Sequence, residues 1–354
     1  MAEQKVVISK DLKADLQAFL AALNYDKLFI LTDTNTQEKC YPLIQDVPAI
    51  KEAPVITVDA GDTHKGLEAL SNIWMRLSNE GASRNSLLVN LGGGMVTDMG
   101  GFAGATFKRG LKTVNIPTTL MASVDAAVGG KTGINFNGLK NEIGSFYPPE
   151  CVFIDCEFLR TLDRDNLLSG YAEMIKHALI SSMDTYATVM LFDLDQKMDY
   201  AFLNKMVAQS VAVKERIVAE DPKEHGIRKA LNFGHTIGHA YESLSFKKNR
   251  PLLHGHAVAA GIVSELYLSH KLCGFPSSNL SQVIQYIKEY YPAFIFDCKD
   301  YETLYELMTH DKKNEGDIIN FTLLSKIGEV QINQAVTKDK ILESLDFYRE
   351  SFGV

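Results

Sequence analysis

The chain has 354 residues, of which 46% are hydrophobic and 23% charged, and its formal net charge is -8. That length allows two domains with a large buried core, and the composition is ordinary for a soluble globular protein. The acidic balance argues against a general nucleic-acid-binding protein, because a phosphate backbone needs a basic surface. It does not exclude a small anionic substrate held in a local basic pocket.

Cysteine usage and hydropathy bear on the compartment. The cysteines are odd in number and form no CxxC pair, which favours reduced thiols over a disulfide framework. Residues 1–16 lack an apolar signal core, and no apolar run approaches the roughly 18 residues that a membrane span needs. We therefore expect a soluble cytoplasmic protein. The five cysteines are Cys40, Cys151, Cys156, Cys273 and Cys298.

Apolar, β-rich runs alternate with helical patterns over the first 160 residues. Such alternation predicts βαβ units and a mainly parallel sheet, as in a Rossmann-like α/β domain. The predicted strands are 27–33, 54–60, 86–91, 112–117 and 151–156, and a helix is predicted at 65–79.

The pattern changes near residue 163, where consecutive helices begin. A boundary near residue 162 therefore separates an α/β domain (1–162) from a mainly helical domain (163–354), and we expect the active site in the cleft between them. Helices are predicted at 163–180, 184–193, 199–219, 228–245, 256–272, 279–289 and 300–310, with one β hairpin at 318–332.

Three glycines follow the predicted strand 86–91 in the stretch LGGGMVTDMGG (91–101), and a helical pattern follows them. Glycine lets the backbone approach a phosphate closely, and a helix N-terminus offers free N–H groups and a positive dipole end. We interpret the stretch as a site for a nucleotide pyrophosphate. The alternative is a tight strand-to-helix turn that needs glycine for packing. Thr118 and Thr119 follow another strand, where α/β folds place ligands.

Two further segments carry polar side chains beside glycines. GGKTGIN (129–135) and GLKNEIG (138–144) place Lys131, Lys140 and Asn141 on predicted glycine-rich loops. Lysine on a loop is usually solvated surface, but near a nucleotide turn it can also bind an anion. Both interpretations remain open.

The predicted helix around residues 170–179 carries Glu173, Lys176 and His177 on one face. The spacing i, i+3, i+4 brings such side chains together. Standing alone, the helix would carry only an exposed Glu–Lys pair of small energetic effect.

A second polar set lies on the predicted helix 228–245. Arg228, Asn232, His235 and His239 are spaced by about one turn, which predicts a continuous polar stripe. A helix buried between domains would need partners for such a stripe, because unpaired buried polar groups are costly.

Two more histidines, His254 and His256, stand at the start of the next apolar helix. Imidazoles with a carboxylate suit zinc or a similar divalent ion, and three protein ligands leave a catalytic position open. His235 and His239 have the i, i+4 spacing of HExxH zinc proteases but lack the glutamate between them. Spacing alone does not choose the ligands.

Taken together, several segments resemble the 3-dehydroquinate synthase family, a group of sugar-phosphate cyclases that shares its architecture with glycerol and iron-dependent alcohol dehydrogenases. The resemblance covers nearly the whole chain. The segments are GGGMVTDMGGFAG, IPTTLMASVDAAVGGKTGIN, KNEIGSFYPP, GYAEMIKHA, LNFGHTIGHAYE, LLHGHAVAAG and DKKNEG, in this order.

The resemblance implies different roles for the histidines. In the family, one carboxylate and two histidines hold the metal, zinc or cobalt, and these match Glu173, His235 and His254. His239 matches a histidine that contacts the substrate and assists proton movement. This division fits ligands from three segments surrounding one ion while another imidazole stays free to titrate.

The resemblance also implies which residues contact the substrate and NAD. Glu224 matches a supporting acidic residue, and Lys312 or Lys313 matches a further substrate lysine. The other substrate contacts match Arg109, Asp125, Lys131, Asn141, Lys176, Lys214, Arg228 and Asn232. The NAD contacts match Asp33, Asp62, Lys65, Gly93, Gly94, Met95, Asp98, Thr118, Thr119, Lys140 and Thr161.

Two positions depart from the family pattern. Asp62 stands where the family usually has glutamate, which shortens that side chain by one methylene. His256 stands where glutamate is common, so it is either a bystander or a competitor for the metal.

The implied reaction converts 3-deoxy-D-arabino-heptulosonate 7-phosphate to 3-dehydroquinate and phosphate, the second step of the shikimate pathway towards chorismate and the aromatic amino acids. It uses NAD and a divalent metal, has no net redox change, and classifies the enzyme as a carbon–oxygen lyase acting on phosphates. The family also implies a homodimer. The alternatives are another sugar-phosphate cyclase, which makes an inosose or a valiolone, and a metal- and NAD-dependent polyol dehydrogenase.

Overall fold

The computed structural model describes residues 4–137, 139–309 and 319–354. The chain divides into two units. The first unit comprises Met1–Asp163 with Tyr200–Val211, and the second comprises Arg164–Asp199 with Ala212–Val354.

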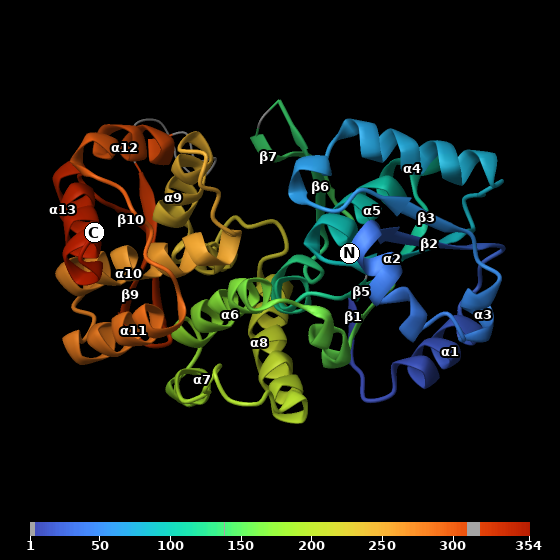
Figure 1. The fold of residues 1–354 in the computed structure, drawn as a ribbon, viewed down its shortest axis with the longest axis horizontal. Helices are drawn as coiled ribbons and strands as arrows, with labels where there is room; N and C mark the ends of the chain where they lie inside the picture. Colours follow the sequence, from blue (N-terminus) through green and yellow to red (C-terminus); the bar gives the residue numbers. More distant parts are fainter. Residues whose placement is uncertain (1–3, 138, 310–318) are drawn as a thin grey trace. The chain divides into compact units, whose positions relative to one another are not determined.

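A six-stranded sheet forms the centre of the first unit (Figure 1). Its order is β1-β8-β5-β4-β2-β3, and every neighbouring pair is parallel. The five predicted strands are all present, and β1 was not predicted. The strands are β1 (Lys5–Ile8), β2 (Leu28–Asp33), β3 (Val55–Val58), β4 (Leu87–Gly92), β5 (Lys112–Pro117) and β8 (Cys151–Ile154).

Helices cover both faces of this sheet. Successive residues of a strand point to opposite faces, so the apolar side chains of one strand pack against helices on both sides. On one face, Ile30 of β2 packs in a cluster with Leu16 of α1. On the other face, Leu31 lies in a cluster with Ile73 of α4 and Met99 of α5. The apolar residues at successive positions of β2 are therefore explained by burial on both sides.

The helices of the first unit follow the strands in alternation. The main helices are α1 (Leu12–Ala22), α2 (Thr34–Lys39), α3 (Pro48–Lys51), α4 (Leu67–Asn79) and α5 (Gly94–Thr106), and the short turns are η1 (Tyr41–Leu43), η2 (Asp62–His64), η3 (Phe107–Arg109), η4 (Ala122–Ala126) and η5 (Cys156–Thr161).

The predicted glycine-rich loops at 129–144 are instead a β hairpin, so that prediction was wrong. Lys131 begins β6 (Lys131–Phe136), and Lys140 and Asn141 lie on β7 (Leu139–Phe146). Glycine serves close approach between the strands: a Cβ on Gly144 would lie 2.1 Å from the backbone oxygen of Thr132.

Helices make up most of the second unit, with α10 (His254–Cys273) at its centre. Every residue of α10 from Gly255 to Ser269 is buried, as expected for a helix covered on all sides. The other elements are α6 (Arg164–Leu179), α7 (Met183–Met190), η6 (Ile227–Asn232), α9 (His235–Lys247), α11 (Ser277–Tyr290), η7 (Cys298–Asp300), α12 (Tyr301–Thr309), β9 (Asn320–Lys326), β10 (Glu329–Ala335) and α13 (Lys338–Phe352), while α8 (Tyr200–Glu220) contributes residues to both units.

The predicted helix 228–245 is broken, which corrects the predicted continuous stripe. Arg228 and Asn232 lie on the 3-10 turn η6, and the chain then passes through Gly234 at φ 78°. His235 is the first residue of α9. The polar residues therefore sit on two elements with a left-handed turn between them, which glycine adopts readily.

The fold class is confirmed: a parallel α/β unit is joined to a mainly helical one. The hairpin β9–β10 matches the predicted one, with Gly328 at φ 81° in its turn, whereas α13 was not predicted. No helix in the described ranges is long and apolar enough to cross a membrane. All five cysteines are free.

Candidate active site

In the first unit, several predicted cofactor residues meet at one edge of the sheet. Strands β2, β4 and β5 are parallel neighbours, so their carboxyl ends share that edge. Asp33 ends β2, Gly93 follows β4, and Thr118 follows β5, where its N–H donates to the oxygen of Gly92 at 3.0 Å. Ligands of open α/β sheets bind at such an edge.

The start of α5 has the properties of an anion site. Its N-cap is Gly93, no side chain among the described residues caps it, and its first turn carries no acid. The glycines also serve packing, since a Cβ on Gly92 would lie 2.5 Å from Cβ of Val96. A Cβ on Gly100 would lie 2.0 Å from Oδ1 of Asn90 on β4. The geometry therefore supports both interpretations of the glycines at once.

Lys65 contacts one residue predicted to bind the cofactor and one predicted to bind the substrate. It is only 4% exposed, and its Nζ lies 2.6 Å from Oδ2 of Asp98 and 2.5 Å from Oδ1 of Asn141. Nearby, Nζ of Lys140 lies 3.3 Å from Oδ2 of Asp62 in an exposed pair. The shorter Asp62 side chain thus still finds a partner on β7, while the buried Lys65 pair is the firmer contact.

The remaining predicted residues of the first unit lie at the ends of its elements. Arg109 and Asn141 have φ of 69° and 50°, and Glu224 in the second unit has φ of 63°. Left-handed backbone is strained for Arg109 and Glu224, whereas asparagine adopts it more readily. Gly94 and Met95 lie in the first turn of α5, Thr119 follows β5, Asp125 lies in the π-helical turn η4, and Thr161 ends η5.

In the second unit, Glu173 and Lys176 form a buried ion pair on α6. Their side chains are 0% and 1% exposed, so the exposed surface pair considered from the sequence is wrong. Burial alone would raise the pKa of Glu173, but the charge of Lys176 and the neighbouring His235 hold it well below its usual range. Glu173 is therefore a carboxylate, fit to bind a cation.

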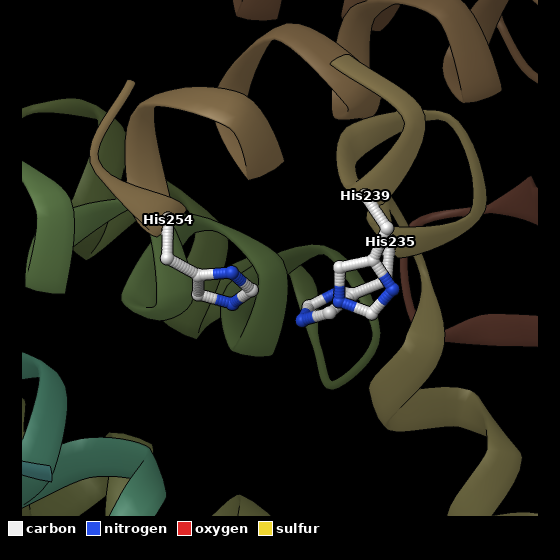
Figure 2. A group of neighbouring side chains, drawn as sticks. All are labelled: His235, His239 and His254. Carbon is white, nitrogen blue, oxygen red and sulfur yellow. The ribbon is translucent and has the colours of Figure 1, made fainter. Parts of the chain in front are cut away.

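Three imidazoles of the second unit converge on one another (Figure 2). One ring nitrogen each of His235, His239 and His254 lies within 4.8 Å of the others. His235 and His239 project from one face of α9, as their spacing predicts, and their rings are 5.2 Å apart. His254 comes from the start of α10.

The distances fit a single metal ion between Glu173, His235 and His254. Oε1 of Glu173 lies 3.5 Å from Nε2 of His235 and 3.7 Å from Nε2 of His254. Two ligand atoms about 2.1 Å from one tetrahedral ion lie about 3.4 Å apart, so these spacings match ligands better than hydrogen bonds. Oε1 also makes no hydrogen bond of normal geometry to the described part of the chain.

Both ring nitrogens of these two histidines have a defined partner. Nδ1 of His235 lies 3.1 Å from the oxygen of Phe233, and Nδ1 of His254 lies 3.1 Å from Oε2 of Glu242. A carbonyl or carboxylate oxygen can only accept, so Nδ1 carries the hydrogen and Nε2 turns to Glu173. Metal-binding histidines typically have such a partner behind them.

The electrostatics of the two histidines differ. Burial and the charge of Lys176 lower the pKa of His235 to about 3, against the pull of Glu173. Burial also disfavours the charged form of His254, but Glu242 and Glu173 outweigh it and raise its pKa to about 10. Glu242 and Glu173 thus favour a positive charge at this position. A bound divalent cation would supply that charge.

Two buried carboxylates near the histidines were missed by the sequence analysis. Glu242 on α9 contacts His254, as described above. Glu265 on α10 is 0% exposed and accepts the backbone N–H groups of Gly234 and Ile237 at 2.6 and 3.0 Å.

The other predicted residues of the second unit are mostly buried. Lys214 and Arg228 are 6% and 2% exposed, and Nη1 of Arg228 donates to the oxygen of Pro222 at 2.7 Å. Nδ2 of Asn232 donates to Oε1 of Glu224 at 2.7 Å, which supports the supporting role expected for Glu224. Lys312 and Lys313 lie outside the described residues.

His256 lies apart from this cluster. It belongs to no group of possible metal ligands among the described residues, and its ring meets the edge of Tyr291 at 5.6 Å. Burial lowers its pKa despite the opposing charge of Asp165. These contacts favour the bystander interpretation over competition for the metal.

Comparisons with known proteins identify the family. A family profile described as 3-dehydroquinate synthase N-terminal matches residues 55–169, and one described as 3-dehydroquinate synthase C-terminal matches residues 170–314. A 3-dehydroquinate synthase from Parabacteroides distasonis is 78% identical over 354 residues, 100% of both chains. One from Campylobacter jejuni subsp. doylei is 35% identical over 336 residues, 92% of this chain and 94% of the relative.

Solved structures share the fold at low identity. A 2-epi-5-epi-valiolone synthase from Streptomyces hygroscopicus subsp. jinggangensis with NAD+ and Zn2+ bound gives a TM-score of 0.87 at 24% identity, covering 99% and 98% of the two chains. A 2-deoxy-scyllo-inosose synthase complexed with carbaglucose-6-phosphate, NAD+ and Co2+ gives 0.83 at 23%, covering 98% and 96%. By its profile matches and its full-length relatives, the chain belongs to the 3-dehydroquinate synthase family.

Proposed function

We propose that this chain is a 3-dehydroquinate synthase that converts 3-deoxy-D-arabino-heptulosonate 7-phosphate to 3-dehydroquinate and phosphate. The observation that carries the proposal is 78% identity, over the whole of both chains, to a protein of that name. The enzyme is then a lyase of the shikimate pathway, and it acts on a phosphorylated sugar acid.

The proposed cofactors are NAD and one divalent metal ion. Related folds hold NAD+ with Co2+ or Zn2+, and both sites in this chain have suitable residues. NAD would accept a hydride and return it, and the metal would act as a Lewis acid towards a substrate oxygen. Zinc and cobalt both suit a carboxylate and imidazole ligand set.

We assign NAD to the domain formed by residues 1–162, and the metal with the buried substrate-binding cations to the domain formed by residues 163–354. The uncapped start of α5 suits the pyrophosphate, and Asp33 at the end of β2 suits a ribose hydroxyl. The remaining proposed contacts are Asp62, Lys65, Gly93, Gly94, Met95, Asp98, Thr118, Thr119, Lys140 and Thr161.

We assign the metal to Glu173, His235 and His254, and leave His239 for proton transfer to or from the substrate. The short spacings from Glu173 to His235 and His254 support this division. The ring of His239 lies 5.7 Å from that of His254, beside the proposed metal ligands. His239 is only half-buried, so a substrate bound at the metal can reach it.

The substrate carries a phosphate and a carboxylate, which need cations. Buried Lys176, Lys214 and Arg228 can neutralise such groups strongly, because a buried cation is poorly screened. The other proposed contacts are Arg109, Asp125, Lys131, Asn141, Asn232 and one of Lys312 and Lys313, with Glu224 orienting Asn232.

Another sugar-phosphate cyclase is the second candidate, because the solved neighbours with TM-scores of 0.87 and 0.83 make a valiolone and an inosose. Product analysis by NMR distinguishes the two. We expect 3-dehydroquinate from the heptulosonate phosphate and no product from sugar phosphates that lack a carboxylate. Turnover of a non-carboxylated sugar phosphate in place of the heptulosonate would favour the second candidate.

We also infer a homodimer in the cytoplasm. The family resemblance supports the dimer, and the free cysteines fit a reducing compartment. Sedimentation velocity on the purified protein tests the dimer, and a monomer at micromolar concentration would contradict it.

A further inference from the structure

The two helices that carry the candidate metal-binding histidines both begin at a histidine. His235 is the first residue of α9, and His254 is the first residue of α10. The separation of their Nε2 atoms therefore depends on how the two helix starts are held. The two helices pack against each other, so each can supply groups that hold the other.

Glu265, about three turns into α10, holds the start of α9. Its two carboxylate oxygens accept the N–H groups of Gly234 and Ile237 at 2.6 and 3.0 Å. The first N–H groups of a helix have no acceptor within it, and the N-cap Gly234 has no side chain to supply one. A fully buried carboxylate from the neighbouring helix takes that role and meets the positive end of the helix dipole.

Glu242, in the middle of α9, holds the side chain of the first residue of α10 in return. It is 4% exposed, and its Oε2 accepts from Nδ1 of His254 at 3.1 Å. This contact fixes the ring so that Nε2 turns to Glu173, 3.7 Å away. A carboxylate behind an imidazole also raises its basicity towards a metal.

Glycines bring the two helix backbones together between these contacts. A Cβ on Gly261 of α10 would lie 2.2 Å from the oxygen of Gly234 and 2.6 Å from the nitrogen of Gly238. A Cβ on Gly238 would lie 3.1 Å from the oxygen of Ala257. The helices therefore cannot shift towards each other, and the two carboxylates resist a shift apart.

We propose that Glu242 and Glu265 form a reciprocal clamp, in which each helix holds the first turn of the other and thereby sets the His235–His254 separation for one divalent cation. Both are positioning residues, since neither is assigned to the metal itself. The inference rests on the metal site in the proposed function. It adds a determinant of metal affinity that lies outside the ligand set.

The test measures Co2+ binding by the full chain without NAD or substrate. Chelator competition gives the Kd, and the visible absorption of bound Co2+ reports the ligand geometry. The variants are Glu265→Gln, Glu242→Gln and the double substitution. Glu343→Gln is the control, because Glu343 on α13 accepts from Tyr267 near the other end of α10, at 2.5 Å, away from both histidines. Unfolding midpoints are measured on the same samples.

We expect each single substitution to weaken Co2+ binding by about 10–100-fold and to alter the spectrum, as supporting groups of metal ligands typically do. The double substitution should raise the Kd by less than the product of the two single-variant fold-changes. Both residues act on the same His235–His254 separation, so their effects are not independent. Glu343→Gln should bind as the unchanged chain does. If Glu265→Gln fails to fold, Glu242→Gln decides, since it removes the carboxylate charge behind His254 and leaves the contacts of Glu265 with the start of α9 in place.

Unchanged Kd and spectrum in a folded Glu265→Gln or Glu242→Gln, with only a lower unfolding midpoint, would overturn the clamp. Absence of Co2+ binding by the unchanged chain would overturn the metal site and the clamp together. Normal Co2+ binding without turnover of the heptulosonate phosphate would count against the proposed function and leave the clamp standing.

Discussion

His235 and His239 are chemically identical and lie one turn apart, yet their surroundings differ. His235 is 8% exposed, its Nδ1 has the oxygen of Phe233 as partner, and its Nε2 lies 3.5 Å from Glu173. His239 is half-buried at the edge of the same cluster. Burial and a preset tautomer suit a metal ligand, whereas partial exposure suits proton transfer.

Substitution of each histidine by alanine separates these roles. We expect His235→Ala to weaken metal binding by more than about 100-fold, because it removes a proposed ligand. His239→Ala should keep the metal and lower kcat by about 10²–10⁴-fold, the usual contribution of a general acid or base. Metal content after dialysis, measured with kcat on the same samples, checks both. An equal loss of metal in the two variants would contradict the ligand assignment.

At this scale the sequence predicted the cluster but not its supports. The spacing of His235 and His239 placed them on one face, but ligands that come from three helices cannot be chosen by spacing. Glu242 and Glu265 resembled ordinary helix acids. The available signal was a lone carboxylate in the apolar run AVAAGIVSELYL (257–268), since a buried acid needs partners.

At the scale of helices and strands, tertiary contacts in two places override the structure that the local sequence pattern predicts. Residues 228–245 have the periodicity of one helix, but Gly234 turns left-handed and divides them. A Cβ at Gly234 would lie 2.5 Å from Cγ1 of Ile262, so this glycine serves both the turn and the contact with α10. The hairpin β6–β7 was missed for a similar reason, because glycines that permit close strand pairing were interpreted as loop residues.

The crossing of α9 and α10 predicts the effect of Gly261→Ala. Alanine favours a helix by about 1 kcal/mol over glycine, so an exposed site would be stabilised. At Gly261 the new Cβ would lie 2.2 Å from the backbone oxygen of Gly234, which cannot rotate away. We expect a net loss of about 1–3 kcal/mol in the free energy of unfolding.

Urea unfolding of the full chain measures this change in the free energy of unfolding. Ser243→Ala, on the exposed side of α9, is the control and should alter the free energy of unfolding by less than about 0.5 kcal/mol. A stabilised Gly261→Ala would show that the two backbones are not in the contact described.

For the whole molecule, the parallel sheet and the mainly helical second unit were predictable, since alternation and periodicity are properties of long segments. The terminal elements β1 and α13 were not, because each is short or polar enough to have no distinct pattern. The net charge of -8 also predicted nothing about the site, where buried Lys176, Lys214 and Arg228 provide local positive charge.

A metal bound only by the folded chain must stabilise it. At a free Zn2+ concentration about 100-fold above Kd, the free energy of unfolding should rise by about 2.7 kcal/mol. Thermal unfolding with and without chelator measures this as a rise in midpoint. Glu173→Gln should lose the rise, because its amide is a poorer ligand than the carboxylate. An equal rise in Glu173→Gln would place the stabilising ion elsewhere.

The central claim is a redox-neutral cyclisation that regenerates its NAD. The most direct measurement combines purified protein, one divalent metal, 3-deoxy-D-arabino-heptulosonate 7-phosphate and NAD+ in substoichiometric amount, with phosphate release and NADH absorbance followed together. The account predicts phosphate in large excess over the NAD+ supplied, with no lasting NADH. Phosphate release limited to the amount of NAD+, with NADH accumulating in step, would contradict it and indicate a dehydrogenase.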